Sequence, residues 1–184
     1  MCIFCWSNTA SQLCTACRRE LRSVEATTIS GVCIESAAAH ESVARRMVHL
    51  LKYQGMEAAG SVLAAMMAPL VAPDAKALVP VPRADFRRLR YGVDPARVLA
   101  AALAELTGVP VASGLAAAFW WPSHAGSSRA RRRAPRFRTV RPVPVGSVLV
   151  DDVLTTGATL VAAARLAGCR RAITATRAES RCLE

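Results

Sequence analysis

The sequence predicts an α/β protein in which helices flank a parallel sheet, with a small cysteine-rich segment at the N-terminus. Strand-like and helical segments alternate along residues 23–184, an order typical of βαβ units and a parallel sheet. Residues 1–22 differ, because they are rich in cysteine and polar residues and offer few apolar positions for a core. We therefore expect two units, a cysteine-rich segment over 1–22 and an α/β domain over 23–184.

The first elements of the domain follow from the apolar pattern. Apolar residues recur at helical spacing along 40–53, and a second helical pattern covers 57–71. The short apolar run 77–81 contains prolines near its end and predicts a buried strand that leads into a loop.

The second half continues the alternation. An Asp-Pro pair predicts a helix over 94–107, because Asp suits the N-cap and Pro the first turn, and a glycine follows its end. A strand is expected over 115–121. Residues 122–142 lack periodicity and are rich in arginine, proline and serine, which predicts a long mobile loop. The last elements are expected as a strand at 147–151, a helix at 159–167 and a strand at 171–176.

Length and composition fit one ordinary folded domain with a small appendage. The chain has 184 residues, 53% apolar and 20% charged, which excludes a disordered polar chain. The longest apolar stretch, 62–73, has about 12 residues, whereas a bilayer span needs about 20. The first residues lack the basic and apolar regions of a secretory signal. We expect a cytoplasmic protein without membrane insertion.

The charge balance is strongly basic, with a formal net charge of +11. Such an excess suits phosphorylated substrates, nucleic acid or anionic lipid. Lys52 and Lys76 are the only lysines, so nearly all cations are arginine, and alanine is also abundant. A GC-rich coding bias explains this composition equally well, so charge alone leaves the partner open.

Four N-terminal cysteines form two CxxC pairs with eight residues between them. Two such pairs can supply the tetrahedral four-sulfur shell that zinc prefers. A full shell of four protein ligands leaves no position for substrate, so the site is expected to be structural. A coincidence or a redox pair is the alternative. The expected ligands are Cys2, Cys5, Cys14 and Cys17.

The stretch 148–159 is the most informative part of the chain. An apolar strand delivers Asp151 and Asp152 to its carboxyl end, and a Thr/Gly loop then opens a helix. The N–H groups of such a loop, together with the helix dipole, suit a phosphate. The carboxylates can accept hydrogen bonds from sugar hydroxyls or help position Mg²⁺ beside a pyrophosphate. The alternative is a helix N-cap or a solvated turn.

In these motifs the chain resembles the ComF family of type I phosphoribosyltransferases over essentially its full length. The resemblance rests on the cysteine set, on the run at 148–159 and on three further segments. These are Leu51-Lys52-Tyr53-Gln54-Gly55, Val79-Pro80-Val81-Pro82-Arg83, and the run containing Arg88, Arg90 and Gly92. The resemblance implies a type I phosphoribosyltransferase fold with an N-terminal zinc knuckle.

The resemblance also implies a site for phosphoribosyl pyrophosphate (PRPP) with Mg²⁺. Asp151 and Asp152 are the implied catalytic residues, which contact the ribose. Pro82 and Arg83 are the implied pyrophosphate residues. The implied PRPP-binding set is Asp151, Asp152, Thr155, Thr156, Gly157, Ala158 and Thr159. Lys52 is either a further ligand contact or simply a favourable cation at a helix C-terminus.

Arginines in the 122–142 segment can close over pyrophosphate, because guanidinium groups bind phosphate oxygens in pairs. A solvated arginine run is the plainer alternative. Contact with single-stranded DNA is a third, because Trp120 and Trp121 adjoin the segment and can stack on bases. The implied loop residues are Arg129, Arg131, Arg132 and Arg133.

The expected function is transfer of phosphoribosyl from PRPP to an unknown nitrogen acceptor, with release of pyrophosphate. A non-catalytic factor is the alternative, binding PRPP or single-stranded DNA alongside DNA-uptake proteins. The net charge of +11 and a loop that departs from the family pattern motivate it, because His124, Ser127 and Pro135 replace Gln, Leu and Asn. A further departure is Asp94-Pro95, which replaces an Asn-Gln pair. No catalytic base is identified, and no histidine has an evident partner.

Overall fold

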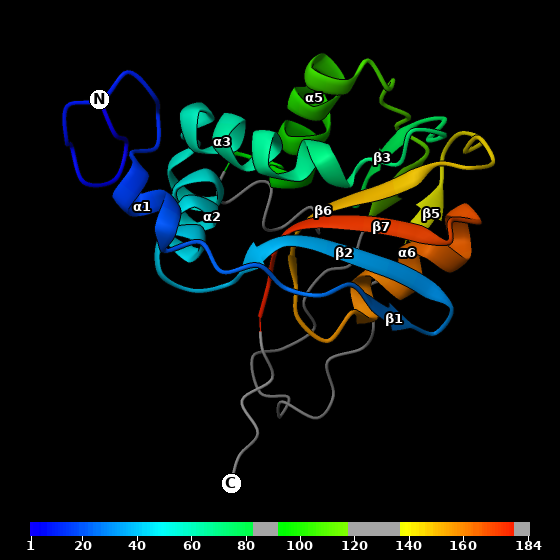
Figure 1. Cartoon of the computed structure of the whole chain (residues 1–184). Coiled ribbons are helices and arrows are strands. Elements are labelled where there is room, and N and C mark those ends of the chain that lie inside the picture. Colours follow the sequence, from blue (N-terminus) through cyan, green and yellow to red (C-terminus); the bar gives the residue numbers. More distant parts are fainter. Residues whose placement is uncertain (83–91, 118–136, 179–184) are drawn as a thin grey trace, which may run out of the picture.

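The computed structural model describes residues 1–82, 92–117 and 137–178 (Figure 1). Its main sheet has five strands in the order β1-β2-β7-β6-β3. They are β1 (Thr27–Ile29), β2 (Val32–Ala39), β7 (Arg171–Arg177), β6 (Val148–Leu154) and β3 (Leu78–Pro80). The pairs β2–β7, β7–β6 and β6–β3 are parallel, and β1 runs antiparallel to β2. The expected α/β class with a mostly parallel sheet is therefore confirmed.

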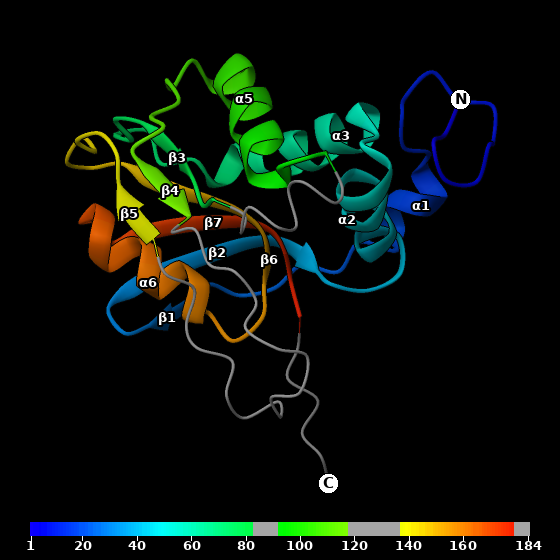
Figure 2. The ribbon, with the colours of Figure 1, turned by 180° about the vertical axis from the view of Figure 1, so that it is seen from behind.

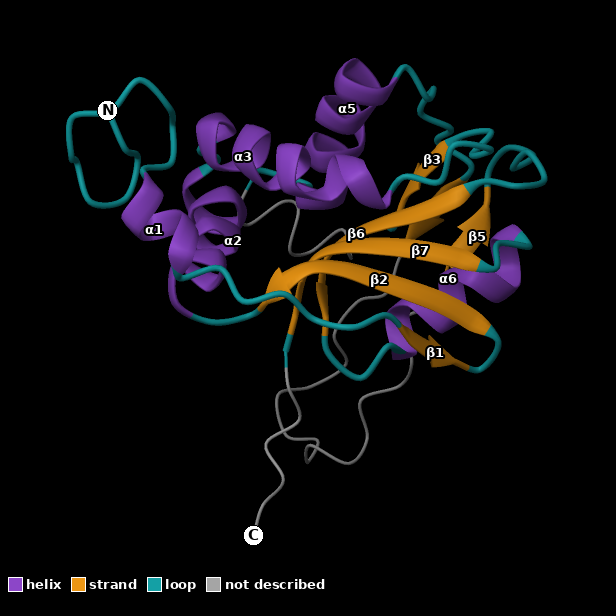
Figure 3. Cartoon of the chain, in the orientation of Figure 1, coloured by secondary structure: helices purple, strands orange, loops and turns teal. Residues whose placement is uncertain are grey.

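Helices cover both faces of this sheet (Figures 1 and 3). Those on one face are α2 (Ser42–Gln54), α3 (Glu57–Met67) and α5 (Pro95–Thr107). The other face carries α6 (Ala158–Ala167), beside a small antiparallel pair of β4 (Leu115–Ala117) and β5 (Phe137–Thr139) (Figure 2). The β6–α6–β7 segment is thus a βαβ unit, as the alternating pattern predicts.

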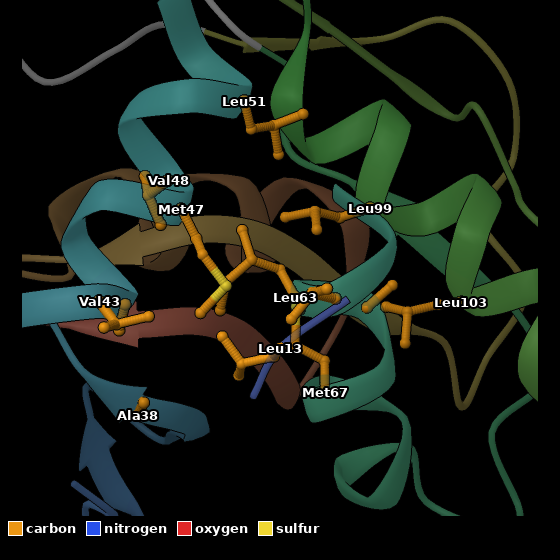
Figure 4. Close-up of a cluster of buried hydrophobic side chains, with 14 of the residues drawn as sticks. Leu13, Ala38, Val43, Met47, Val48, Leu51, Leu63, Met67, Leu99 and Leu103 are labelled. Atoms are coloured by element: carbon orange, nitrogen blue, oxygen red, sulfur yellow. The ribbon is translucent and has the colours of Figure 1, made fainter. Parts of the chain in front are cut away.

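The larger core lies between the sheet and the three-helix face. Met47 of α2, Leu63 and Met67 of α3, and Leu99 and Leu103 of α5 are fully buried there (Figure 4). Leu63 and Met67 are four residues apart, as are Leu99 and Leu103, so each pair lies on one face of its helix. A second cluster, which includes Leu149 and Leu160, fills the space between the sheet and α6.

The cysteine-rich segment packs onto this core. It contains a short helix, α1 (Thr15–Arg19). Phe4 and Leu13 are buried and belong to the same cluster as Met47. Arg22 is the last residue of the segment, and its carbonyl accepts a 2.8 Å hydrogen bond from the N–H of Ala39 at the end of β2. Residues 1–22 therefore contribute apolar side chains to the core despite their polar composition.

Most predicted helix ends agree with the structure. α5 spans Pro95–Thr107 with Gly108 in the left-handed conformation at its end (φ 74°), although the Asp94 side chain makes no capping hydrogen bond. The second helix is shorter than expected, because α3 ends at Met67 and a 3-10 turn, η1 (Ala68–Leu70), follows at a proline.

Three expectations about strands need correction. The predicted loop 122–142 contains β5, whose Phe137 pairs with Ala117. The strand expected at 147–151 extends to Leu154. The antiparallel β1 and the long β2, which the sequence pattern did not identify, complete one side of the sheet. Within residues 1–82, 92–117 and 137–178, no helix is long and apolar enough to cross a membrane.

Candidate functional site

The four parallel strands of the sheet all end at one edge, which we call the carboxyl edge. Val81 N–H donates to Val150 O at 2.9 Å just after β3, and Ala178 N–H donates to Leu154 O at 2.8 Å after β7. These bonds hold the strand ends in register. In open α/β sheets, ligands bind outside the carboxyl ends of the strands.

Asp151 and Asp152 lie in the last half of β6, beside this edge. Both are partly buried, and the backbone N–H of Asp152 donates to Asp151 Oδ1 at 2.8 Å. Lys52 Nζ lies 2.8 Å from Asp152 Oδ1, and the exposed fractions of the two side chains are 22% and 13%. Helix α2 thus supplies a cation to the acidic pair, a contact that sequence reasoning left open.

The two carboxyl groups differ in their environment. Burial, followed by the negative charge of Asp152, raises the pKa of Asp151 to about 8, against smaller opposing effects of the Asp152 N–H and Lys52. The raised pKa favours the protonated form of Asp151, which can donate a hydrogen bond. Asp152 is held by the Lys52 ammonium, so the pair combines a donor with an ion-paired acceptor.

The loop between β6 and α6 follows directly. Thr155 and Thr156 are exposed, and Gly157 is buried with φ 76° at the helix N-cap. A Cβ added to Gly157 would lie 2.6 Å from Ile29 Cδ1 of β1, so the loop fits closely against that strand. The first N–H groups of α6 have no partner within the helix. Ala158 N–H donates to Thr156 Oγ1 at 3.5 Å, a long contact that an anion could replace. Exposed hydroxyls together with the N-terminal amides of a ten-residue helix can hold an anion.

The structure brings together the predicted PRPP set, because Asp151, Asp152 and residues 155–159 share one strand, loop and helix start. Pro82 lies two residues beyond the end of β3, the strand beside β6. Arg83 and the four predicted loop arginines lie outside the described residues. So do Trp120 and Trp121. Grooves along α6 lie toward its C-terminal end, lined by residues such as Arg165. The grooves therefore do not mark the carboxyl edge, and it is the acids and the threonine loop that make this edge the candidate site.

Sequence reasoning also missed His40. This residue follows β2 at the carboxyl edge, and its Nδ1 lies 2.8 Å from Thr176 Oγ1 of β7. The Thr176 hydroxyl in turn donates to the backbone O of Asp152 at 3.4 Å. No local pattern marks this contact, because it joins residues 136 positions apart.

The second predicted site is confirmed as a cluster that can hold a metal ion. The Sγ atoms of Cys2, Cys5, Cys14 and Cys17 lie within 4.8 Å of one another. Two Sγ pairs are close, Cys5–Cys14 at 3.5 Å and Cys2–Cys17 at 3.8 Å. Sulfurs around a tetrahedral zinc at about 2.3 Å lie about 3.8 Å apart, so the geometry suits this ion.

Backbone N–H groups prepare this cluster for a cation. They lower the pKa of Cys2 to about 6, with the N–H of Cys5 the largest cause. The pKa of Cys14 is lowered chiefly by the N–H of Cys17, which donates to its sulfur at 3.5 Å. Burial raises the pKa of Cys17. Metal ligation requires thiolates, so two of the four sulfurs are already favoured in that form.

The chain was also compared with known proteins. No protein-family model matches it, and no curated protein matches it in sequence.

Proposed function

We propose that this chain is a ComF-like phosphoribosyltransferase that binds PRPP with Mg²⁺ and transfers the phosphoribosyl group to a nitrogen acceptor. One observation carries the proposal: two carboxyl groups lie in the second half of β6, and a loop with two exposed threonines and a buried glycine then opens α6 at the carboxyl edge. A sugar phosphate presents vicinal hydroxyls beside a dianion, and this arrangement offers partners for both.

In the proposed complex, the loop from Thr155 to Thr159 binds the 5′-phosphate through amides, hydroxyls and the helix dipole. Asp151 and Asp152 bind the ribose hydroxyls. The raised pKa of Asp151 favours a carboxylic acid that donates, while Asp152 accepts. The two groups can thereby fix the orientation of the sugar ring.

Catalysis in this proposal is mainly positioning and electrostatics. Mg²⁺ bound with PRPP would offset the negative charge of the leaving pyrophosphate. Lys52 keeps the acidic pair from repelling the polyanionic substrate, because it balances the charge of Asp152. Pro82, two residues beyond the end of the neighbouring strand β3, is the described residue that we propose for pyrophosphate contact.

The four cysteines are proposed to hold a structural zinc ion. Their sulfurs complete a four-coordinate shell, so the ion would take no part in the reaction. Its role would be to fold the segment that places Phe4 and Leu13 in the core.

The test is release of pyrophosphate from Mg²⁺–PRPP with a panel of nitrogen bases and amines as acceptors. Asp152→Asn removes the charge that Lys52 binds while keeping the side-chain shape. It should lower turnover at least about 100-fold. Asp74→Asn is the matched control, because Asp74 is exposed and pairs with Arg171 at the start of β7, away from the carboxyl edge.

Turnover that is equal in the wild type and in Asp152→Asn would refute the proposed site. PRPP binding without pyrophosphate release under any acceptor would favour the non-catalytic alternative, and single-stranded DNA would then be the next ligand to titrate.

A further inference from the structure

His40 is held at the carboxyl edge by two strands. It directly follows β2, and its backbone N–H donates to Arg177 O at the end of β7 at 2.7 Å. Its side chain is partly buried. The backbone on which the imidazole stands is therefore fixed by the sheet rather than by a loop.

Thr176 makes two hydrogen-bond contacts that bear on which ring nitrogen of His40 carries the proton. A hydroxyl has a single hydrogen to donate. When Thr176 Oγ1 donates it to the backbone O of Asp152 at 3.4 Å, the hydroxyl accepts at its 2.8 Å contact with His40 Nδ1. In that tautomer Nδ1 carries the proton and the lone pair of the neutral ring is on Nε2. In the opposite tautomer the hydroxyl donates to Nδ1 and Nε2 carries the proton. Within residues 1–82, 92–117 and 137–178, Nε2 has no hydrogen-bonding partner.

Buried hydroxyls fix this part of the sheet. Ser36 Oγ of β2 lies 2.7 Å from Thr174 Oγ1 of β7, and Thr174 donates to Thr176 O at 3.2 Å. Both Thr174 and Thr176 are fully buried. A base whose second nitrogen is oriented by a fixed hydroxyl is the arrangement that proton-accepting residues share.

The charges around His40 favour its neutral form. Burial is the largest cause that lowers its pKa, followed by Lys52 and Arg45 of α2, whereas Asp152 of β6 raises it. Thr176, the partner from β7, is uncharged. The ring is thus free to accept a proton at neutral pH, and the nearby Asp152 carboxylate stabilises the imidazolium that results.

We propose that His40 is the base that accepts the proton of the attacking nucleophile in phosphoribosyl transfer. This inference rests on the proposed function. The nucleophile's lone pair forms a bond to C1 of PRPP, and the bond from C1 to the pyrophosphate oxygen breaks. Its electron pair leaves with pyrophosphate. The proton of the nucleophile passes to Nε2, so charge and atoms balance.

The variant His40→Asn tests this role. Its amide nitrogen can still donate to Thr176, but it offers no basic Nε2. The matched control is His49→Asn, because His49 is an exposed histidine of α2 that contacts Tyr53. Water serves as the probe nucleophile, with pyrophosphate release from Mg²⁺–PRPP as the rate and calorimetric titration of Mg²⁺–PRPP as the binding measurement.

His40→Asn should bind Mg²⁺–PRPP within about 2-fold of the wild type while its rate falls at least about 100-fold. The wild-type rate should rise with pH and level off, with its midpoint below the ordinary histidine value of 6.5, and the variant should lose this rise. Nitrogen-15 spectra of the imidazole should show the Nδ1–H form. The control His49→Asn should match the wild type in PRPP binding, in the rate and its pH dependence, and in the spectrum of His40.

An unchanged rate in His40→Asn, an Nε2–H form, or a wild type that binds PRPP but releases no pyrophosphate would overturn the role of His40 and leave the PRPP site standing. A wild type that does not bind Mg²⁺–PRPP would instead refute the proposed function itself, and the inference with it.

Discussion

Lys52 Nζ lies 2.8 Å from Asp152 Oδ1, and this ion pair joins the last turn of α2 to the carboxyl edge of β6. Both side chains are mostly buried, so the pair is weakly screened by solvent. The ion pair thus connects α2, on the three-helix face of the sheet, with the acidic residues of β6. The same lysine also acts on His40, whose pKa it lowers.

Removing the cation should therefore destabilise the fold. Lys52→Met leaves the Asp152 charge partly buried beside Asp151, and we expect a loss of about 2 kcal/mol in the free energy of unfolding. Lys76→Met is the control, because Lys76 is exposed. Urea unfolding of both variants measures the difference. The double variant with Asp152→Asn should recover part of the loss, and strict additivity would contradict the pairing.

Asp151 should make stability depend on pH. Its pKa rises from 3.8 to about 8 on folding, so the folded state holds the proton more tightly than the unfolded chain. The stability that this group contributes is complete below about pH 4 and is lost as the pH rises to about 8. Asp151→Asn should remove this dependence, and its Tm relative to the wild type should increase between pH 5 and pH 8. A constant Tm difference would show that Asp151 ionises normally.

Gly157 should tolerate no side chain. Gly157 has a φ of 76°, and Gly157→Ala would add a Cβ 2.6 Å from Ile29 Cδ1. We expect the free energy of unfolding to fall by about 2–4 kcal/mol and PRPP binding to weaken. Gly168→Ala is the matched control, because its φ is 68° but nothing lies within 4 Å of the added Cβ. The free energy of unfolding of this control should fall by about 1–2 kcal/mol, and it should bind PRPP as the wild type does. Chemical unfolding measures the stability of each variant, and calorimetry measures its PRPP binding. Equal losses of stability in the two variants would contradict the close packing of Gly157 against Ile29.

The cysteine cluster should bind zinc and stabilise the whole fold. Cys5→Ser removes one ligand from an exposed position, so it leaves the core packing intact. We expect metal content to fall from about one zinc per chain to near zero, and the Tm to fall with it. Cys33→Ser, at an exposed cysteine outside the cluster, should change neither. Elemental analysis measures the zinc content, and thermal unfolding after titration with a chelator measures the effect of zinc on the Tm. Equal zinc content in Cys5→Ser and the wild type would contradict the prediction.

The sequence predicted best those helices whose ends are marked by proline or glycine. Pro95 and Gly108 mark both ends of α5, and Gly168 marks the end of α6, because proline and glycine have strong conformational preferences at helix ends. Neighbouring residues alone likewise predict a site at the acids and the Thr-Gly loop, and this stays a prediction. The cysteines were grouped by spacing.

Features that depend on distant partners were not predictable in this way. β2 is rich in alanine and serine, and its pairing with β7 joins residues 138 positions apart, such as Ser36 and Thr174. β5 is three residues long and is stabilised by pairing with β4. The contacts of Lys52 with β6 and of His40 with β7 also join residues that are far apart in the sequence. Sequence spacing does not encode such contacts.

The central claim is that the carboxyl edge around Asp151 and Asp152 binds PRPP. Calorimetric titration of the zinc-loaded protein with PRPP, with and without Mg²⁺, tests it most directly beside the double variant Asp151→Asn/Asp152→Asn. The account predicts Mg²⁺-dependent binding by the wild type that the folded double variant loses. Equal binding by both proteins, or no binding by a folded wild type, would contradict it.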